Sequence, residues 1–544
     1  MFGVEREDGM ITMLPIAWTI GLSLVLQVPP PETGPSVSVE LQETRRAIEE
    51  REAKALESLA VSLTGDGMVQ ARSEVRRLLP RTKPRDGASR VTPLPEVVPP
   101  QGRGLASVSS GTGKPAGKGS AQTWLAELQQ IRFKAASELF DLAKRAATAR
   151  PPVYAHAAVY LREVLQRQPD HPEARRLLGY VPYEGGWARP FAVRQLKDGN
   201  VNHPIFGWVP AGWVQHLDRG ELPAYSVRGQ KQVRWLPAQE ADRLRSNWKN
   251  PWQIATEHFE IQSDVPLGEA IEFARRLEAF YDVFFTLLAD LVGENLPLAR
   301  RFRAPSLTGE TSYRLHQVFY FATKDEYVEH LRLSTGDDID QSLGYYNPPR
   351  PGKGNRAVAY FFRDVDGQLP VTATLYHEVS HQLLFETAGP NAYKKNVGNY
   401  WVFEGLGTYF ETVTPQSDGS LEVGGLVGER LAAARQSLAD GRFLPLEQFL
   451  MLDQNSFNRP DRIHANYQQA MALAVFLMQW NDGTYRDAFL DFVRDAYRGR
   501  IKRGTGRSLE DRLGKLVRVI ETQFRDFLGF NPPPAVRPGE TALP

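Results

Sequence analysis

The chain has 544 residues, and its 65 lysines and arginines nearly balance its 64 aspartates and glutamates, which leaves a formal net charge of +1. This length predicts two or more domains, since one hydrophobic core rarely serves so long a chain. The balanced charge gives no global basis for binding nucleic acid. The absence of cysteine excludes disulfides, thiol nucleophiles and thiolate-bound metal, so a metal would depend on histidine and carboxylate side chains.

An apolar run near the N-terminus, residues 13–28, is followed at once by three prolines. It is shorter than the ~20 apolar residues that cross a membrane, and it suits the central part of a signal peptide. We therefore expect residues 1–36 to be a signal peptide or an N-terminal anchor. The protein would then be exported, to the periplasm or the exterior, and would contact a membrane only through this segment.

The next two segments differ in composition. Residues 37–79 carry dense opposite charges and favour a solvated helix or a short coiled coil. Residues 80–120 are rich in Pro, Gly, Ser and Lys, which predicts a disordered linker. The Gly/Lys stretch 111–120 inside it has the wrong spacing for a phosphate-binding loop, and Pro115 interrupts it.

Helical periodicity returns over residues 121–180. Residues 154–178 resemble one and a half tetratricopeptide-type hairpins. Because a solenoid needs about three repeats, this implies a helical spacer or a docking module for a protein partner. Residues 181–252 then alternate short polar segments with Gly and Trp, a pattern typical of small β-hairpins. We expect these tryptophans to form a compact core, with a ligand platform as the alternative.

Residues 253–530 combine both kinds of secondary structure. Strands are predicted at 259–263, 317–322 and 357–362, and a long amphipathic helix at 267–291. After residue 411 the predicted segments are helical, and residues 531–544 form a short proline-rich polar tail. Strands followed by helices predict an α+β domain with two lobes and a cleft between them.

Residues 374–411 contain the most informative motif. His377 and His381 stand four apart, so on a helix both imidazoles project from one face. Glu378, beside the first histidine, can then reach a water on an ion that the histidines hold. This His-Glu-x-x-His arrangement predicts Zn²⁺ with a general base. Glu404, 23 residues beyond His381, could supply a third ligand; two structural histidines without a metal are the alternative.

The sequences TLYHEVSHQ at 374–382 and WVFEGLG at 401–407 resemble the gluzincins, the peptidase MA-like zinc metallopeptidases, and more narrowly their exported bacterial members of unknown function. The resemblance covers about residues 253–530. It implies a zincin-like fold, with His377, His381 and Glu404 as Zn²⁺ ligands and Glu378 as catalytic base. It also implies that the strand before the metal-binding helix is the edge that binds an extended peptide by strand addition. In this chain that strand comprises Ala357, Val358, Ala359, Tyr360, Phe361 and Phe362.

Four further residues are candidates for supporting roles. Tyr467, or else His464 one helical turn earlier, could donate a hydrogen bond to a developing oxyanion. Glu411 could orient a ligand histidine, as metal-bound imidazoles usually need a carboxylate or carbonyl partner, but a solvated glutamate is equally expected. Thr408 occupies the position four after Glu404, where related enzymes often carry an acidic residue.

Three functions are compatible with these residues. A zinc metallopeptidase that cleaves a peptide or protein substrate is favoured, because a pure scaffold has no use for Glu378 beside a metal. A non-catalytic scaffold that acts through the tetratricopeptide-like helices is the alternative. Hydrolysis of a non-peptide amide would share the metal chemistry and differ only in the shape of the cleft.

Overall fold

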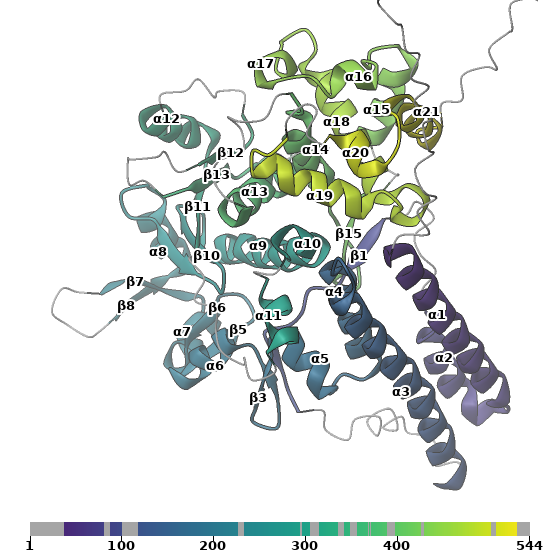
Figure 1. The fold of residues 1–544 in the computed structure, drawn as a ribbon. Helices are drawn as coiled ribbons and strands as arrows, with labels where there is room; N and C mark the ends of the chain where they lie inside the picture. Colours follow the sequence, from purple (N-terminus) through teal and green to yellow (C-terminus); the bar gives the residue numbers. More distant parts are fainter. Residues whose placement is uncertain are drawn as a thin grey trace, which may run out of the picture.

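The computed structural model of the chain describes residues 37–80, 88–100, 118–226, 233–293, 296–304, 315–335, 342–348, 356–367, 369, 371–388, 398–425, 429–501 and 508–529. Its elements are helices and small sheets (Figure 1), which confirms the predicted mixed α+β class. None of the described helices is long and apolar enough to cross a membrane. The predicted signal or anchor, residues 1–36, and the predicted tail, residues 531–544, lie outside the described residues.

A five-stranded sheet positions the motif described above. From one edge to the other its strands are β12 (Tyr345–Asn347), β13 (Val358–Phe362), β11 (His316–Phe321), β10 (Phe259–Ser263) and β9 (Trp252–Ala255). The three inner strands are parallel to one another, and both edge strands run antiparallel to their neighbours. β13 is buried at every position, as expected for an inner strand with both faces covered.

Alternate side chains of β13 pack into two different hydrophobic cores, one on each face of the sheet. Ala359 and Phe361 belong to the main core, together with residues of α9 (Leu267–Leu287) and α13 (Val371–Ala388). Val358, Tyr360 and Phe362 belong to a smaller core with α12 (Lys324–Thr335). Because strand side chains alternate between faces, α13 lies on the face opposite α12. The helix that carries the His-Glu-x-x-His motif is thereby fixed against the sheet.

The C-terminal helices share the main core with the sheet. They are α14 (Trp401–Phe410), α15 (Glu429–Ala439), α16 (Leu446–Phe449), α17 (Gln454–Phe457), α18 (Ile463–Gly483), α19 (Arg486–Tyr497), α20 (Leu509–Leu513) and α21 (Val517–Phe527). Trp401 is fully buried at the start of α14 and stacks on Phe489 and Phe492 of α19, with ring centroids 6.0 and 6.2 Å apart. This aromatic contact fixes α14, which contacts both α13 and α18.

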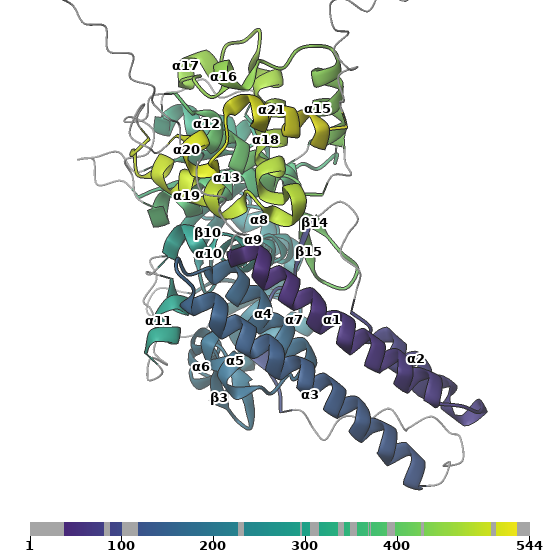
Figure 2. The same cartoon turned by 45° about the vertical axis from the view of Figure 1, so that its right-hand side comes forward.

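The N-terminal helices form an elongated group that projects from the rest of the molecule (Figure 2). They are α1 (Val37–Ser62), α2 (Val69–Arg77) after a 3₁₀ turn at Asp66–Met68, α3 (Lys118–Thr148), α4 (Tyr154–Arg167) and α5 (Pro172–Leu177). The charges of α1 are not all solvated, contrary to the expectation: Glu52 is 3% exposed and pairs with Arg167 of α4 at 2.6 Å. A partner on another helix, which local composition does not reveal, accounts for this burial. The tetratricopeptide-like character of residues 154–178 stays a prediction.

The predicted disorder of residues 80–120 is wrong for residues 88–100. There β1 (Ser89–Val91) pairs with β15 (Leu421–Val423), which also pairs with β14 (Thr414–Pro415), and β2 (Val97–Val98) pairs with β4 (Gly186–Ala188). Proline-rich composition favoured disorder, but strands far along the chain supply the backbone hydrogen bonds. Residues 81–87 and 101–117 lie outside the described part of the chain.

A module of hairpins and short helices joins the N-terminal helices to the sheet. It comprises β3 (Val181–Tyr183), β4, α6 (Pro190–Lys197), β5 (Asn200–His203), β6 (Gly207–Pro210), a 3₁₀ turn at Ala211–Trp213, α7 (Val214–Asp218), β7 (Glu221–Ser226), β8 (Val233–Pro237) and α8 (Ala238–Arg245). Trp213 and Trp235 meet edge to face with ring centroids 5.4 Å apart. They pack against a small core that includes Trp252 of β9, so this module adjoins the sheet edge at β9. Two short helices, α10 (Ala289–Val292) and α11 (Pro297–Arg303), lead from α9 toward β11.

Candidate metal centre

α13 and α14 approach closely because glycine occupies the contact positions on α14. A methyl group at Gly407 would lie 2.8 Å from both Cε1 and Nε2 of His377, and one at Gly405 would lie 2.8 Å from the carbonyl oxygen of Ala470 on α18. Real Cβ atoms essentially never come this close to other atoms. The two glycines therefore let α14 fit between α13 and α18, and this places Glu404 beside the histidines.

The predicted ligands converge. Nε2 of His377 and Nε2 of His381 are 3.1 Å apart, and Oε2 of Glu404 lies 3.4 Å from the first and 3.7 Å from the second. All three side chains are buried, and the group could hold a metal ion. Ligands at ~2.0–2.2 Å around a tetrahedral ion stand about 3.3–3.6 Å apart, so the spacing of these atoms suits one ion.

The surrounding groups point the donor atoms inward. Nδ1 of His377 donates to Oε1 of Glu411 at 2.7 Å, which leaves Nε2 as the free donor atom for a metal. The hydroxyl of Tyr400 donates to Oε1 of Glu404 at 2.7 Å, while Oε2 faces the imidazoles. Glu411 thus lies where the sequence suggested, with only 6% of its side chain exposed. It is not a solvated glutamate.

The electrostatics of the site also favour a cation. Burial alone would lower the pKa of His377, but the carboxylates of Glu404 and Glu411 outweigh burial and raise that pKa to about 10. Burial would raise the pKa of Glu404, yet the two imidazoles hold it well below its ordinary value. Two imidazole nitrogens 3.1 Å apart cannot direct lone pairs at each other without a proton or a cation between them. The donor set therefore fits a metal ion.

Glu378 lies at the junction of α13 and β12. Its side chain is partly buried, and its Oε2 accepts a hydrogen bond from the backbone N–H of Tyr346 at 3.1 Å. Gly344, just before β12, lies so close that an added Cβ would be 3.2 Å from Cγ of Glu378. One oxygen of this carboxylate is thus held by the edge strand.

The prediction that residues 357–362 form the free edge strand is wrong. β13 pairs with β11 on one side and with β12 on the other, where Tyr345 lies opposite Tyr360 and Asn347 opposite Val358. Ala357 precedes the strand. The apolar sequence of Val358, Ala359, Tyr360, Phe361 and Phe362 belongs to an inner strand, since both faces are buried. Among the described residues, the edge on this side of the sheet is β12.

The remaining candidates are Tyr467, His464 and Thr408. The ring of Tyr467 on α18 stacks toward that of His377, with centroids 6.5 Å apart, and burial together with the negative charge of Glu404 raises its pKa. His464 is exposed one turn earlier. Thr408 is buried and donates to the backbone carbonyl of Glu404 at 2.8 Å, so its hydroxyl is engaged within α14 and does not replace an acidic residue beside the histidines.

Sequence reasoning missed three contributors to this site. Tyr400, the N-cap residue of α14, stands four before Glu404, and this helical spacing was the available signal. Gly407 gave a weaker signal as the second glycine of the sequence EGLG. The contact of the Tyr346 N–H with Glu378 was not predictable, because β12 has only three residues and its pairing is not local.

Comparison with known proteins adds one match. Residues 371–501 are similar to a family described as "Protein of unknown function (DUF1570)". The match begins with the first residue of α13 and extends beyond α19, so it covers all the residues of the centre on α13, α14 and α18. No curated protein matches the chain. The similarity of this segment is therefore to a family whose function is unknown.

Proposed function

We propose that this protein is a zinc-dependent metallopeptidase of the gluzincin type. The observation that carries the proposal is the convergence of two imidazoles and one carboxylate, with donor atoms 3.1 to 3.7 Å apart, directly beside Glu378. Imidazole and carboxylate donors in a set of three are typical of catalytic zinc, which keeps its fourth position open. The similarity of residues 371–501 to a family of unknown function neither supports nor opposes this activity.

Each side chain has a role in this proposal. His377, His381 and Glu404 hold the ion, which when bound supplies a Lewis acid that lowers the pKa of water to about 7. Glu378, held by the N–H of Tyr346, takes the proton of the attacking water and passes it to the leaving nitrogen. Tyr467, whose ring centroid lies 6.5 Å from that of His377, donates a hydrogen bond to the developing oxyanion.

The substrate strand of this proposal is β12, which replaces the strand predicted from the sequence. β12 runs antiparallel to β13, and nothing among the described residues pairs with its other side. An extended peptide added there would pass Glu378, whose carboxylate already accepts the outward N–H of Tyr346. The carbonyl of Tyr346 is therefore the group of this residue that would bond to the peptide. The sheet with α13 would form one lobe of a zincin-like domain, and α14 with the later helices would form the other.

The test is cleavage by full-length wild-type protein and by Glu378→Gln, measured with an unbiased peptide library and with zinc content determined on the same samples. We expect the wild type to cleave the library and Glu378→Gln to bind zinc but lose at least about 100-fold in rate, the low end of the usual contribution of a general base. Thr372→Ala, an exposed change on the same helix, is the matched control. Equal behaviour of wild type and Glu378→Gln would favour the alternative, a scaffold whose helices bind a protein partner.

A further inference from the structure

A cavity of about 1030 Å³ lies along β9, the sheet edge farthest from β12. Its walls are α9, β9, the module of hairpins and residues 93–97. None of the residues assigned above to the metal centre lines it. Ligand sites in proteins usually measure about 300–1,000 Å³, so this cavity is large enough for a ligand of several residues.

β9 presents to this cavity backbone groups that pair with no described strand. It pairs with β10 on one side, with Gln253 opposite Gln262 and Ala255 opposite Glu260, and the described residues include no strand on its other side. The hydrogen bond from Thr256 N–H to the Phe259 carbonyl, 2.9 Å, fixes the alternation of bonded and non-bonded pairs. Because Thr256 and Phe259 form a bonded pair, the next pair, Ala255 with Glu260, is non-bonded, and so is Gln253 with Gln262. The N–H and C=O groups of Gln253 and Ala255 therefore point away from β10. Both residues are exposed and line the cavity.

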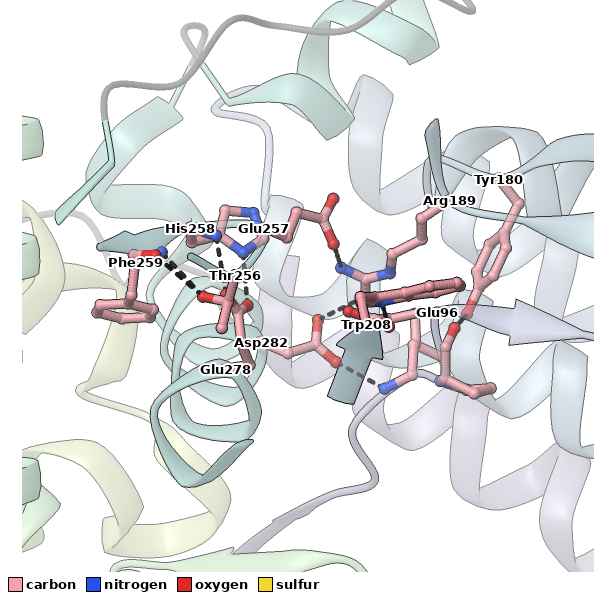
Figure 3. Close-up of polar contacts among 12 residues, drawn as sticks. Glu96, Tyr180, Arg189, Trp208, Thr256, Glu257, His258, Phe259, Glu278 and Asp282 are labelled. Carbon is pink, nitrogen blue, oxygen red and sulfur yellow. Dashed lines mark hydrogen bonds and ion pairs between the residues drawn. The ribbon is translucent and has the colours of Figure 1, made fainter. Parts of the chain in front are cut away.

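Most charged groups on the cavity wall pair with one another (Figure 3). Arg189 lies 3.2 Å from Glu257 and 3.7 Å from Asp282. Glu278 accepts from Nδ1 of His258 at 2.7 Å. These pairs come from α9, from the turn after β9 and from the residue after β4, so they join the module to the sheet. Because these groups pair with one another, they contribute little net charge that could attract a ligand.

Glu96 is the carboxylate of this wall that lacks such a partner. Arg245 and Arg275 also line the cavity and form no ion pair with a described residue, but their guanidinium groups donate to backbone carbonyls. Oε2 of Glu96 accepts hydrogen bonds from Nε1 of Trp208 at 2.7 Å and from Nδ2 of Asn202 at 3.2 Å. Both donors are neutral, and Glu96 forms no ion pair with any described residue. Burial raises the pKa of Glu96, and the nearby carboxylates of Glu257 and Glu278 add to this effect. A carboxylate in such surroundings is stabilised by an added cation. The aromatic rings on the same wall, among them Phe206 and Trp213, offer apolar surface to the rest of a ligand.

We propose that this cavity binds an extended polypeptide segment that carries a basic side chain. The segment adds to β9 as a further strand, and its backbone bonds to the outward groups of Gln253 and Ala255. Its lysine or arginine pairs with Glu96. The site is separate from the proposed metal centre, and its occupation does not depend on peptidase activity.

The test measures binding by the full-length chain carrying Glu378→Gln, so that no probe is cleaved whether or not the wild type is a peptidase. The probes are three fluorescein-labelled pools of end-blocked heptapeptides, drawn from Val, Thr, Ile and Tyr, whose fixed central residue is Lys, norleucine or Glu. Fluorescence anisotropy gives the affinity for each pool. We expect the Lys pool to bind at least about tenfold more tightly than the other two, as one charge-assisted hydrogen bond supplies.

Two substitutions then locate the binding. Glu96→Gln should remove the preference for lysine. Gln253→Pro should weaken binding of all pools about tenfold or more, because it deletes an N–H that faces the cavity and leaves the bonds to β10 in place, as proline does on edge strands. Glu272→Gln, an exposed change on α9, is the matched control and should bind like the parent.

Several results would overturn the proposal. One is the absence of a lysine preference up to about 1 mM peptide, a concentration at which even weak sites bind. Another is a preference for the Glu pool, which would mean that the arginines of the wall, Arg245 and Arg275, and not Glu96 set the charge of the site. A lysine preference that survives both Glu96→Gln and Gln253→Pro would place the binding elsewhere. If a variant does not fold, as judged by its unfolding midpoint, the comparison of the three pools on the parent protein tests the proposal without that variant.

Discussion

Gly407→Ala should weaken zinc binding although residue 407 is not a ligand. The added methyl group would lie 2.8 Å from Cε1 and Nε2 of His377, so the ring must turn or α13 must move away from α14. Overpacking of this kind costs ~1–3 kcal/mol, and the exchange of glycine for alanine within a helix returns about 1 kcal/mol. We expect a net loss of up to about 2 kcal/mol in the free energy of unfolding and a loss of at least about tenfold in zinc affinity.

Gly405→Ala is the matched control for this prediction. It is the same change on the same helix, and its methyl group would come equally close, 2.8 Å, to a backbone oxygen of α18. It should destabilise the protein to a similar degree without touching a ligand ring. Zinc affinity is measured by competition with a chromophoric chelator, and stability by denaturant unfolding. The reasoning fails if Gly407→Ala binds zinc as tightly as Gly405→Ala.

The other predictions concern groups around the centre and in the rest of the fold. Glu411→Gln should lower zinc affinity about 10- to 100-fold, because it weakens the hydrogen bond that orients His377. Glu447→Gln, exposed on α16, should leave zinc affinity unchanged. Equal zinc affinities of the two variants in chelator titrations would refute the role of Glu411. Arg167→Met should lower the free energy of unfolding by about 3 kcal/mol, because it leaves the buried carboxylate of Glu52 underpaired; an unchanged urea midpoint would contradict this. Burial, and to a smaller extent the charge of Asp487, raise the pKa of Asp290 to about 7. The contribution of Asp290 to stability is therefore full below about pH 4 and is lost as the pH rises through 7. Asp290→Asn should therefore gain stability relative to wild type across that interval. Parallel pH profiles of the free energy of unfolding in the two proteins would contradict this prediction.

Local spacing made the convergence of the three donor side chains predictable. The helical repeat alone places His377 and His381 on one face. Glu404, a candidate third ligand 23 residues beyond His381, is also the ligand that the resemblance to gluzincins implies. Glu411 stands seven residues after Glu404, two helical turns, so a shared helix face was a reasonable expectation. These inferences succeed because each depends on one helix, or on two helices that meet at small residues.

Pairing between distant segments was not predictable from the sequence. β12 is three residues long and β2 only two, too short to show the alternation that identifies a strand. The inner position of β13 depends on its pairing with β12, which the sequence does not show. Residues 88–100 were expected to be disordered because of their prolines, but β15 and β4 supply partners that local composition cannot show.

The central claim is that His377, His381 and Glu404 bind one zinc ion together. Zinc X-ray absorption of the full chain loaded with one equivalent of zinc tests it most directly. We predict two imidazole nitrogens at ~2.0–2.1 Å with oxygen ligands beside them, and a loss of half the imidazole signal in His381→Ala. A spectrum without imidazole, or one that is the same in wild type and His381→Ala, would contradict the assignment.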